Sequence, residues 1–205
     1  MDDADRIPYE QLAVETEILP EAFFARATVE VARDLLGKVL VHRRTAGMIV
    51  EVEAYLGAED RAAHASRGLT PRTRVLFGPP GRAYIYFVYG MHECLNIVAE
   101  PDGRPGCVLI RALEPLTGIA LMRRRRPAAR RLEELASGPG RLTAALGITR
   151  RLYGADLTRA GPFTVRRWLR EPPVKVAVSP RIGIRHCADW PLRFFIAGNR
   201  FVSSP

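Results

Sequence analysis

In the stretch GMIVEVEAY at residues 47–55, positions 50–55 alternate apolar and polar side chains with the period of a β-strand. Because residues two apart on a strand point to the same side, we expect Glu51, Glu53 and Tyr55 to share one face, opposite a face of apolar residues suited to a core. A short turn separates this stretch from KVLVH at residues 38–42. The two segments are therefore predicted to form paired strands.

Further strands and helices follow from the same kind of pattern. AYIYFVY at residues 83–89 and CLNIVA at 94–99 flank Tyr89-Gly90-Met91, which is typical of a hairpin turn, and CVLIRAL at 107–113 predicts another strand. Helices are expected at residues 29–36, 58–67, 116–126 and 139–146, and short strands with turns over 174–202. Short connections between strands indicate a mixed α/β (α+β) fold on a largely antiparallel sheet.

The length of 205 residues suits one compact domain. We expect residues 1–18 to be a flexible N-terminal arm, residues 19–205 to form the domain, and Arg123–Glu134 to be a mobile surface loop. The acidic N-terminus does not resemble a signal peptide, and no apolar run approaches the length of a membrane span. Together with three scattered cysteines, which favour reduced thiols, this predicts a cytoplasmic protein. Every large apolar stripe can be buried within the domain itself, so we expect a monomer.

The charge distribution points to a polyanionic partner. The net charge is +9, and residues 1–60 hold 13 acidic and 6 basic side chains, whereas the rest of the chain holds 9 acidic and 25 basic ones. Codon bias can explain why nearly all the basic residues are arginines, but it does not explain the net excess. A basic surface of this kind is typical of proteins that bind nucleic acid.

The triplet of Glu51, Glu53 and Tyr55 has three interpretations. It can supply general acid–base groups, or it can hold Mg²⁺ together with Asp60 in a metal-dependent nuclease. Taken alone, it is more typical of a solvated strand edge. A metal site at His92 and Cys94 has only two ligands and is weaker still.

Aromatic and polar residues near the predicted hairpin are also candidates. His64 could hydrogen-bond a ligand or move a proton, although a lone histidine is more often a surface or capping residue. Tyr84 and Tyr86 share a strand face, and Tyr89 lies at the turn, where an aromatic side chain can project outward and stack on bases. Packing in the core is the commoner fate of such side chains.

Asn96 and Arg111 lie within apolar strands, where an unpartnered polar group is costly. Structural hydrogen bonds explain either residue as well as contact with a ligand does. The runs Arg123–Arg126 and Arg130–Arg131 could bind phosphates or form a solvated helix face. A non-catalytic nucleic-acid binding module therefore stays open as an alternative.

Six ordered blocks of the sequence resemble the alkyladenine (3-methyladenine) DNA glycosylase family. The blocks are ARDLLGKVLV, IVEVEAYLGAEDRAAHASRG, TPRTRVLFGPPGRAYIYFVYGM, CVLIRALEPL, ASGPGRLTAALGI and RIGIRHCADWPLRFFI, and the resemblance extends from about Ala27 to Val202. The resemblance implies a single α/β domain with a curved, largely antiparallel sheet, surrounding helices and a protruding β-hairpin. It implies excision of alkylated or deaminated purines from damaged double-stranded DNA, with no metal and no organic cofactor.

The resemblance also implies roles for individual residues. Glu53 would activate the attacking water, and Arg111 would support that water and the abasic backbone. The flipped base would lie in a pocket formed by Tyr55, His64, Tyr86 and Asn96. Tyr89 and Met91 would enter the duplex, and Arg72, Arg74 and Arg141 would contact the DNA backbone.

The sequence departs from the family at Glu93, where a bulky residue is expected near the pocket, and at Trp190–Pro191, where a loop is shorter. The acidic N-terminal arm has no match in the family. The lysines, Lys38 and Lys175, lie outside the active-site motifs, so no amine is expected to form a Schiff base with the sugar. The enzyme is therefore predicted to be monofunctional.

Overall fold

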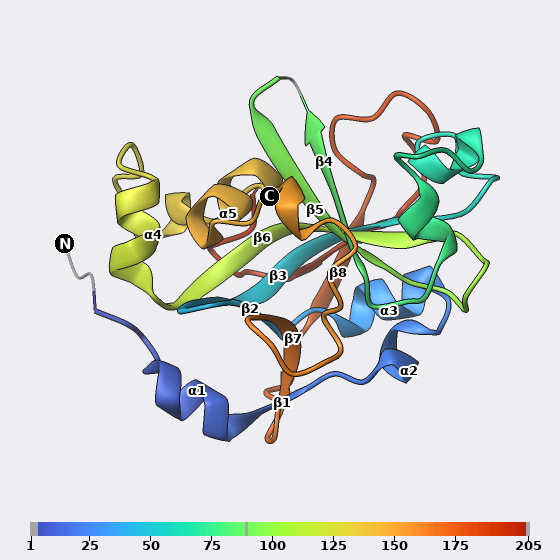
Figure 1. Cartoon of the computed structure of the whole chain (residues 1–205). Helices are drawn as coiled ribbons and strands as arrows, with labels where there is room; N and C mark the ends of the chain where they lie inside the picture. The colour runs from blue at the N-terminus through green and yellow to red at the C-terminus, as the bar shows by residue number, and fades with distance from the viewer. Residues whose placement is uncertain (1–3, 89, 204–205) are drawn as a thin grey trace.

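The computed structural model describes residues 4–88 and 90–203, and it confirms the mixed α/β fold. Within these residues nine antiparallel strands form one curved sheet, in which seven follow the order β1-β7-β2-β3-β6-β5-β4 (Figure 1). The strands are β1 (Thr16–Ile18), β2 (Val39–His42), β3 (Thr45–Tyr55), β4 (Ala83–Val88), β5 (His92–Val98), β6 (Cys107–Thr117), β7 (Phe163–Trp168), β8 (Val176–Ser179) and β9 (Arg193–Ile196).

Strand β3 lies in the centre of the sheet. It pairs with β6 along one side, while β2 and β9 pair with successive parts of its other side. The pairing with β6 is irregular around Glu51, where the register shifts. Glu51 and Glu53 are fully buried. The interpretation of this stretch as a solvated strand edge is therefore wrong, because partners from distant parts of the chain cover both of its sides.

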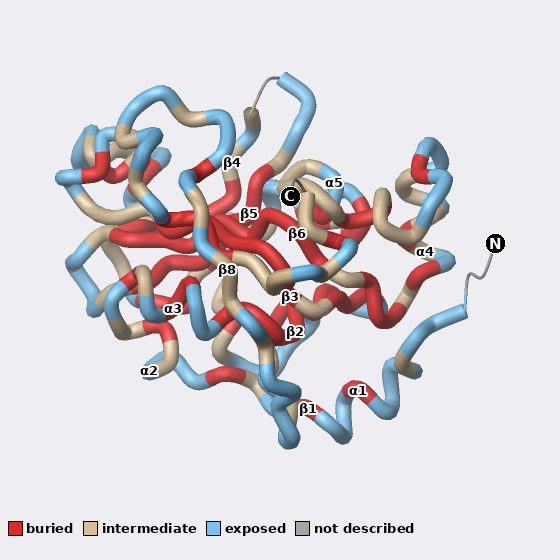
Figure 2. The backbone as a smooth tube through the Cα atoms, turned by 180° about the vertical axis from the view of Figure 1, so that it is seen from behind, coloured by how far each residue is buried: buried red, intermediate tan, exposed pale blue. Residues whose placement is uncertain are grey.

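Helices pack around this sheet and close the main apolar core. They are α1 (Tyr9–Glu15), α2 (Glu21–Phe24), α3 (Thr28–Asp34), α4 (Ile119–Arg125) and α5 (Pro139–Leu146). The core gathers side chains of α3, α4 and α5 on the central strands, and Figure 2 shows these strands as the buried centre of the molecule. In α5 the hydroxyl of Thr143 donates to the carbonyl of Glu93 in β5 at 2.9 Å, which ties the helix to the sheet.

The β4–β5 hairpin protrudes from the body of the protein, as expected (Figure 1). At its tip Gly90 has φ +68°, a left-handed conformation that glycine adopts without strain. Met91 is 68% exposed beside it. Tyr89, the predicted wedge, lies outside the described residues.

The N-terminal segment differs from the expected loose arm over residues 9–18, which form α1 and β1. Strand β1 pairs with β7, and Leu12 of α1 is buried in a small apolar cluster against β2. The carboxylate of Asp5 accepts hydrogen bonds from the backbone N–H groups that begin α4. Apolar contacts and pairing with a strand some 150 positions away thus order a segment whose composition suggests an arm.

Other expected boundaries need correction. The helix predicted over residues 116–126 begins only at Ile119, because β6 continues to Thr117 and Gly118 turns the chain with φ +76°. The helix predicted over 58–67 is reduced to one 3₁₀ turn, η1 (His64–Arg67), and part of the expected loop is helical, in α4 and in η3 (Leu132–Leu135). Among the described residues no helix is long and apolar enough to cross a membrane.

Candidate active site

Glu53 lies on the central strand β3, and three other residues contact its carboxylate. Arg111 on the neighbouring strand β6 places its Nη1 3.1 Å from Oε1 of Glu53. The Tyr55 hydroxyl donates to Oε2 at 2.8 Å, and the backbone N–H of Ile182 donates to Oε1 at 2.7 Å. Burial, followed by the charge of Glu53, raises the pKa of Tyr55, so the phenol keeps its proton. The carboxylate is therefore oriented by three separate groups.

Glu51 forms a second set of buried contacts, which includes the same arginine. Nε of Arg111 and Nε of Arg193 each lie 2.8 Å from its Oε1, and the backbone N–H of Ser203 donates to Oε2 at 2.6 Å. Burial works to raise the pKa of Glu51, but the Ser203 N–H and Arg111 outweigh it, so the pKa is lowered and the group is ionised at neutral pH. Arg111 is thus held between two buried carboxylates.

The charge on Arg111 is secured by its surroundings. Burial opposes this charge, but the carboxylates of Glu53 and Glu51 outweigh the effect of burial and raise the pKa of the guanidinium.

The arrangement does not suit the alternative of a metal ion held by Glu51, Glu53 and Asp60. Each of these carboxylates already faces an arginine, and Asp60 forms a buried ion pair with Arg181 at 2.5 Å.

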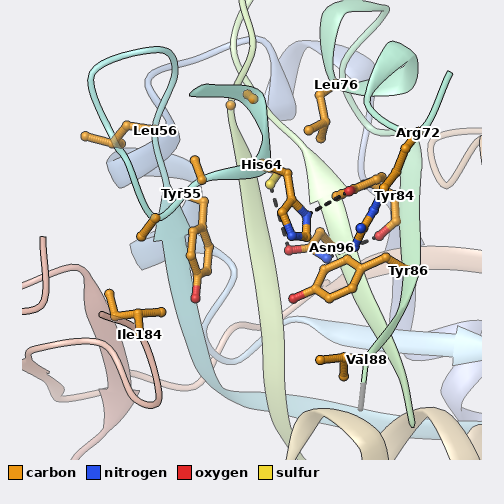
Figure 3. Close-up of a pocket in the computed structure, with 15 residues that line it drawn as sticks. Tyr55, Leu56, His64, Arg72, Leu76, Tyr84, Tyr86, Val88, Asn96 and Ile184 are labelled. Atoms are coloured by element: carbon orange, nitrogen blue, oxygen red, sulfur yellow. Dashed lines mark hydrogen bonds between the residues drawn. The ribbon is translucent and has the colours of Figure 1, made fainter. Parts of the chain in front are cut away.

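An aromatic pocket of about 190 Å³ lies beside Glu53. Figure 3 shows Tyr55 on one side of it and His64 with Tyr86 on the other, with Asn96 between them. These four side chains come from β3, η1, β4 and β5, which the fold brings to one end of the sheet. A slot with aromatic walls and a few polar groups at its edges suits a flat heteroaromatic ligand.

His64 is a neutral member of this pocket. Burial, with further effects from the charges of Arg72 and Arg67, lowers its pKa to about 4. Its Nδ1 lies 2.8 Å from the hydroxyl of Tyr84, whose own pKa burial raises to about 12. Because that hydroxyl also accepts a hydrogen bond from Arg72, its proton goes to Nδ1. His64 therefore carries its proton on Nε2, where it can donate to a ligand.

Asn96 is fixed at the back of the pocket. Its side-chain amide donates to the carbonyl of Tyr84 at 3.2 Å, and its carbonyl oxygen accepts from the Cys107 thiol at 3.8 Å. Burial raises the pKa of that thiol to about 12, so it stays a neutral donor. Asn96 is only 2% exposed, so its position is set by these neighbours.

A second, basic depression adjoins the pocket and shares Tyr55, Tyr86, Val88 and Ile184 with it. Arg111, Arg126 and Arg141 line it, together with His92 and the start of α5 at residues 138–140. The three arginines predicted to contact DNA are all exposed, but only two line a depression: Arg141 lies here and Arg72 lines the aromatic pocket, whereas Arg74 lines neither.

Glu93 lies away from both depressions. Its carboxylate pairs with Nε of Arg150 at 3.2 Å, and Arg150 also stacks on Phe87. The carboxylate at this position, where the sequence departs from the resembled family, is therefore compensated by a neighbouring cation and does not enter the pocket.

Several residues of the site were not singled out from the sequence. Arg181 and Ile182 lie in the quoted block RIGIRHCADWPLRFFI, whose spacing gives no sign that it returns to β3. Arg193 and Ser203 reach Glu51 from positions more than 140 residues away. A buried carboxylate requires a cationic partner, but the sequence does not say which arginine provides it.

Comparisons with known proteins find similar sequences. The family model described as methylpurine-DNA glycosylase matches residues 22–200. A protein of Methanoculleus marisnigri is 53% identical over 90% of this chain and 98% of its own length, and one of Burkholderia lata is 51% identical over 92% of each. Both bear the name "Putative 3-methyladenine DNA glycosylase".

Proposed function

The chain belongs to the methylpurine-DNA glycosylase family, and we propose that it flips damaged purines out of duplex DNA and hydrolyses their bond to the sugar. Membership of the family makes it a DNA-repair hydrolase for alkylated bases. Its proposed substrates are 3-methyladenine, 7-methylguanine, hypoxanthine and ethenoadenine. Its product is DNA with an intact abasic site.

One observation carries the proposal: a buried, oriented carboxylate stands beside an aromatic slot. Glu53 is 0% exposed, and its carboxylate pairs with Arg111 and accepts hydrogen bonds from Tyr55 and Ile182. The ring of Tyr55 also forms one wall of the slot. A base that enters the slot places its sugar next to this carboxylate. Flipping a damaged base costs a few kcal/mol, less than for an intact pair, and stacking between aromatic walls offsets part of that cost.

The chemical step follows from this geometry. A water held between Glu53 and Arg111 attacks C1′ of the sugar, and a new C1′–O bond forms as the C1′–N9 bond breaks. The electron pair of the broken bond leaves with the purine, and Glu53 takes the proton of the water. The carboxylate also stabilises the positive charge that develops on the sugar. General-base assistance of this kind contributes about 10²–10⁴ in rate.

Recognition is assigned to the pocket and the hairpin. Tyr55 stacks on one side of the flipped base and Tyr86 with His64 on the other, and Asn96 crowds the exocyclic amine of ordinary guanine. The hairpin tip, with Tyr89 and Met91, fills the gap left in the duplex. The arginines of the basic depression bind the DNA backbone.

We expect a monofunctional enzyme that acts as a monomer. Lys38 forms an ion pair with Glu171 at 2.9 Å, and neither Lys38 nor Lys175 lines the aromatic pocket or the basic depression. No lysine amine is therefore placed to attack C1′. A covalent protein–DNA complex trapped by borohydride would contradict this proposal.

The test is release of base from duplexes that carry one 7-methylguanine or one hypoxanthine, in the presence of EDTA. The wild-type protein is expected to release the base and leave an alkali-labile site. Glu53→Gln keeps the shape of the side chain but cannot take a proton, so its single-turnover rate should fall by about 10²–10⁴.

Glu59→Gln is the matched control, because Glu59 is an exposed carboxylate six positions away on the same segment. Its rate should equal that of the wild type. Equal rates for Glu53→Gln and wild type would remove Glu53 from the mechanism. Tight DNA binding without base release would support the non-catalytic binding module, and strand cleavage that EDTA abolishes would support the nuclease.

A further inference from the structure

Both aromatic walls of the pocket contact an arginine. The Cζ atom of Arg181 lies 4.6 Å from the centre of the Tyr55 ring, and that of Arg72 lies 5.4 Å from the centre of the Tyr86 ring. A guanidinium in this position is attracted to the negative face of the ring. The rings that would stack on a flipped base therefore already interact with cations.

The two arginines differ in how their charge is compensated. Arg181 is fully buried, and both of its terminal nitrogens bind the carboxylate of Asp60, at 2.5 and 2.9 Å. Arg72 pairs with no carboxylate of the residues that the structure describes, and its side chain ends beside Tyr84 and Tyr86, on the side of His64 away from Tyr55 (Figure 3). Arg72, which lines the pocket and is also exposed to solvent, thus places beside one wall of the pocket a positive charge without a carboxylate partner.

This charge acts on the groups of that wall. The rings of His64 and Tyr86 are 4.6 Å apart, and the low pKa of His64, about 4, arises from burial first and from Arg72 next. The site therefore disfavours a second positive charge on the imidazole. A base with a fixed positive charge, stacked against the same wall, meets the same repulsion.

We propose that Arg72 is a specificity-determining residue, which lowers the excision of purines with a fixed positive charge relative to neutral purines. The inference rests on the proposed function, since it concerns the base that occupies the same pocket. Purines alkylated at N3 or N7 carry such a charge, whereas hypoxanthine and ethenoadenine do not. Cation–π attraction to Tyr86, which would otherwise favour charged bases, is weakened because Arg72 already engages this ring.

The charge of Arg72 acts in the same direction during bond cleavage. When the C1′–N9 bond of a neutral purine breaks, the electron pair makes the departing base an anion, which a nearby cation stabilises. A purine that begins with a positive charge departs as a neutral molecule and gains nothing from the cation. Both effects favour neutral lesions.

The experiment compares single-turnover rates, at saturating enzyme, on duplexes with one 7-methylguanine or one hypoxanthine. Saturation removes differences in DNA affinity, which matter because Arg72 can also contact the backbone. Arg72→Gln should raise the ratio of the 7-methylguanine rate to the hypoxanthine rate by about three- to tenfold, through a faster 7-methylguanine reaction and a slower hypoxanthine reaction. Arg72→Lys keeps the charge and should keep the wild-type ratio.

Arg61→Gln removes an exposed charge between β3 and β4, outside the pocket, and should leave this ratio unchanged. The inference is overturned if Arg72→Gln slows both reactions by one factor, or if the 7-methylguanine reaction of Arg72→Gln is no faster than that of the wild type, which would mean that Arg72 does not repel a charged base. It is also overturned if Arg72→Lys behaves like Arg72→Gln. A wild-type protein that releases neither base would instead overturn the proposed function, so the two failures are distinguishable.

Discussion

Two buried arginines behind the active site, Arg111 and Arg193, both pair with the carboxylate of Glu51. Its carboxylate binds Arg111, Arg193 and Ser203, so Glu51→Gln leaves two arginines without their full complement of acceptors. Breaking such a buried network costs about 3–5 kcal/mol of the free energy of unfolding, which denaturant titration would measure. The same change should lower the single-turnover rate, because Arg111 loses one of the two carboxylates that position it. Glu59→Gln, at an exposed site, should change neither quantity.

The pH dependence of stability follows from the same residue. The pKa of Glu51 is lowered from its ordinary 4.5 in the folded state, so the ionised form stabilises the protein above about pH 4.5. This contribution is lost as the pH falls through the folded-state pKa. The unfolding free energy should therefore decrease below pH 4.5, and the decrease should be shallower in Glu51→Gln. Equal slopes in the two proteins would contradict the lowered pKa.

His64 should remain neutral over the whole range in which the enzyme works. Its pKa of about 4 lies below the ordinary 6.5, so the unfolded chain takes up this proton first as the pH falls. The stability that His64 contributes is complete above pH 6.5 and is lost as the pH falls from 6.5 toward 4. Titration of the imidazole resonances by NMR should place the midpoint near pH 4. A midpoint near 6.5 would show that burial and Arg72 do not act on this ring.

At the scale of elements, the end of the β4–β5 hairpin nearest its turn packs closely on α5. A Cβ atom added at Gly140 would lie 2.8–2.9 Å from atoms of His92, at the start of β5. Gly140→Ala should therefore displace His92 and cost about 1–3 kcal/mol of stability. Combining it with His92→Ala removes the crowding, so the two changes should not add in a double-mutant cycle. Strict additivity would show that the contact is not tight.

At the scale of the whole molecule, the net charge of +9 predicts DNA binding that weakens steeply with salt. Arg141 lines the basic depression beside the active site. Arg141→Gln should lower the slope of log affinity against log salt by about 0.9 for one lost phosphate contact, as measured by fluorescence anisotropy. Arg167 on β7 pairs with Glu17 on β1, and these two strands lie far from the hairpin in Figure 1. Arg167→Gln should therefore leave this slope unchanged. Equal slopes in both variants would remove Arg141 from the DNA interface.

The sequence alone predicted what depends on short-range periodicity. The alternation in β3 placed Glu51, Glu53 and Tyr55 on one face, and the turn at Gly90 predicted the β4–β5 hairpin. These predictions succeed because the side-chain period of a strand and the conformational freedom of glycine are local properties. Six blocks of family resemblance added the identities of the pocket residues, and the structure brings Tyr55, His64, Tyr86 and Asn96 together.

Only the tertiary structure decided which of these residues are buried and what they bind. Glu51 and Glu53 look like a solvated edge until β6, β9 and the C-terminal segment cover them, and the N-terminal segment looks like an arm until β7 pairs with it. The pairing of Arg72 with Tyr86, and of Arg181 with Tyr55, likewise joins segments without any sequence period that links them. The physical reason is that burial and charge pairing depend on separate chain segments, 60 positions apart for Arg111 and Glu51 and 142 for Arg193 and Glu51, whose meeting is set by the packing of the whole sheet and core.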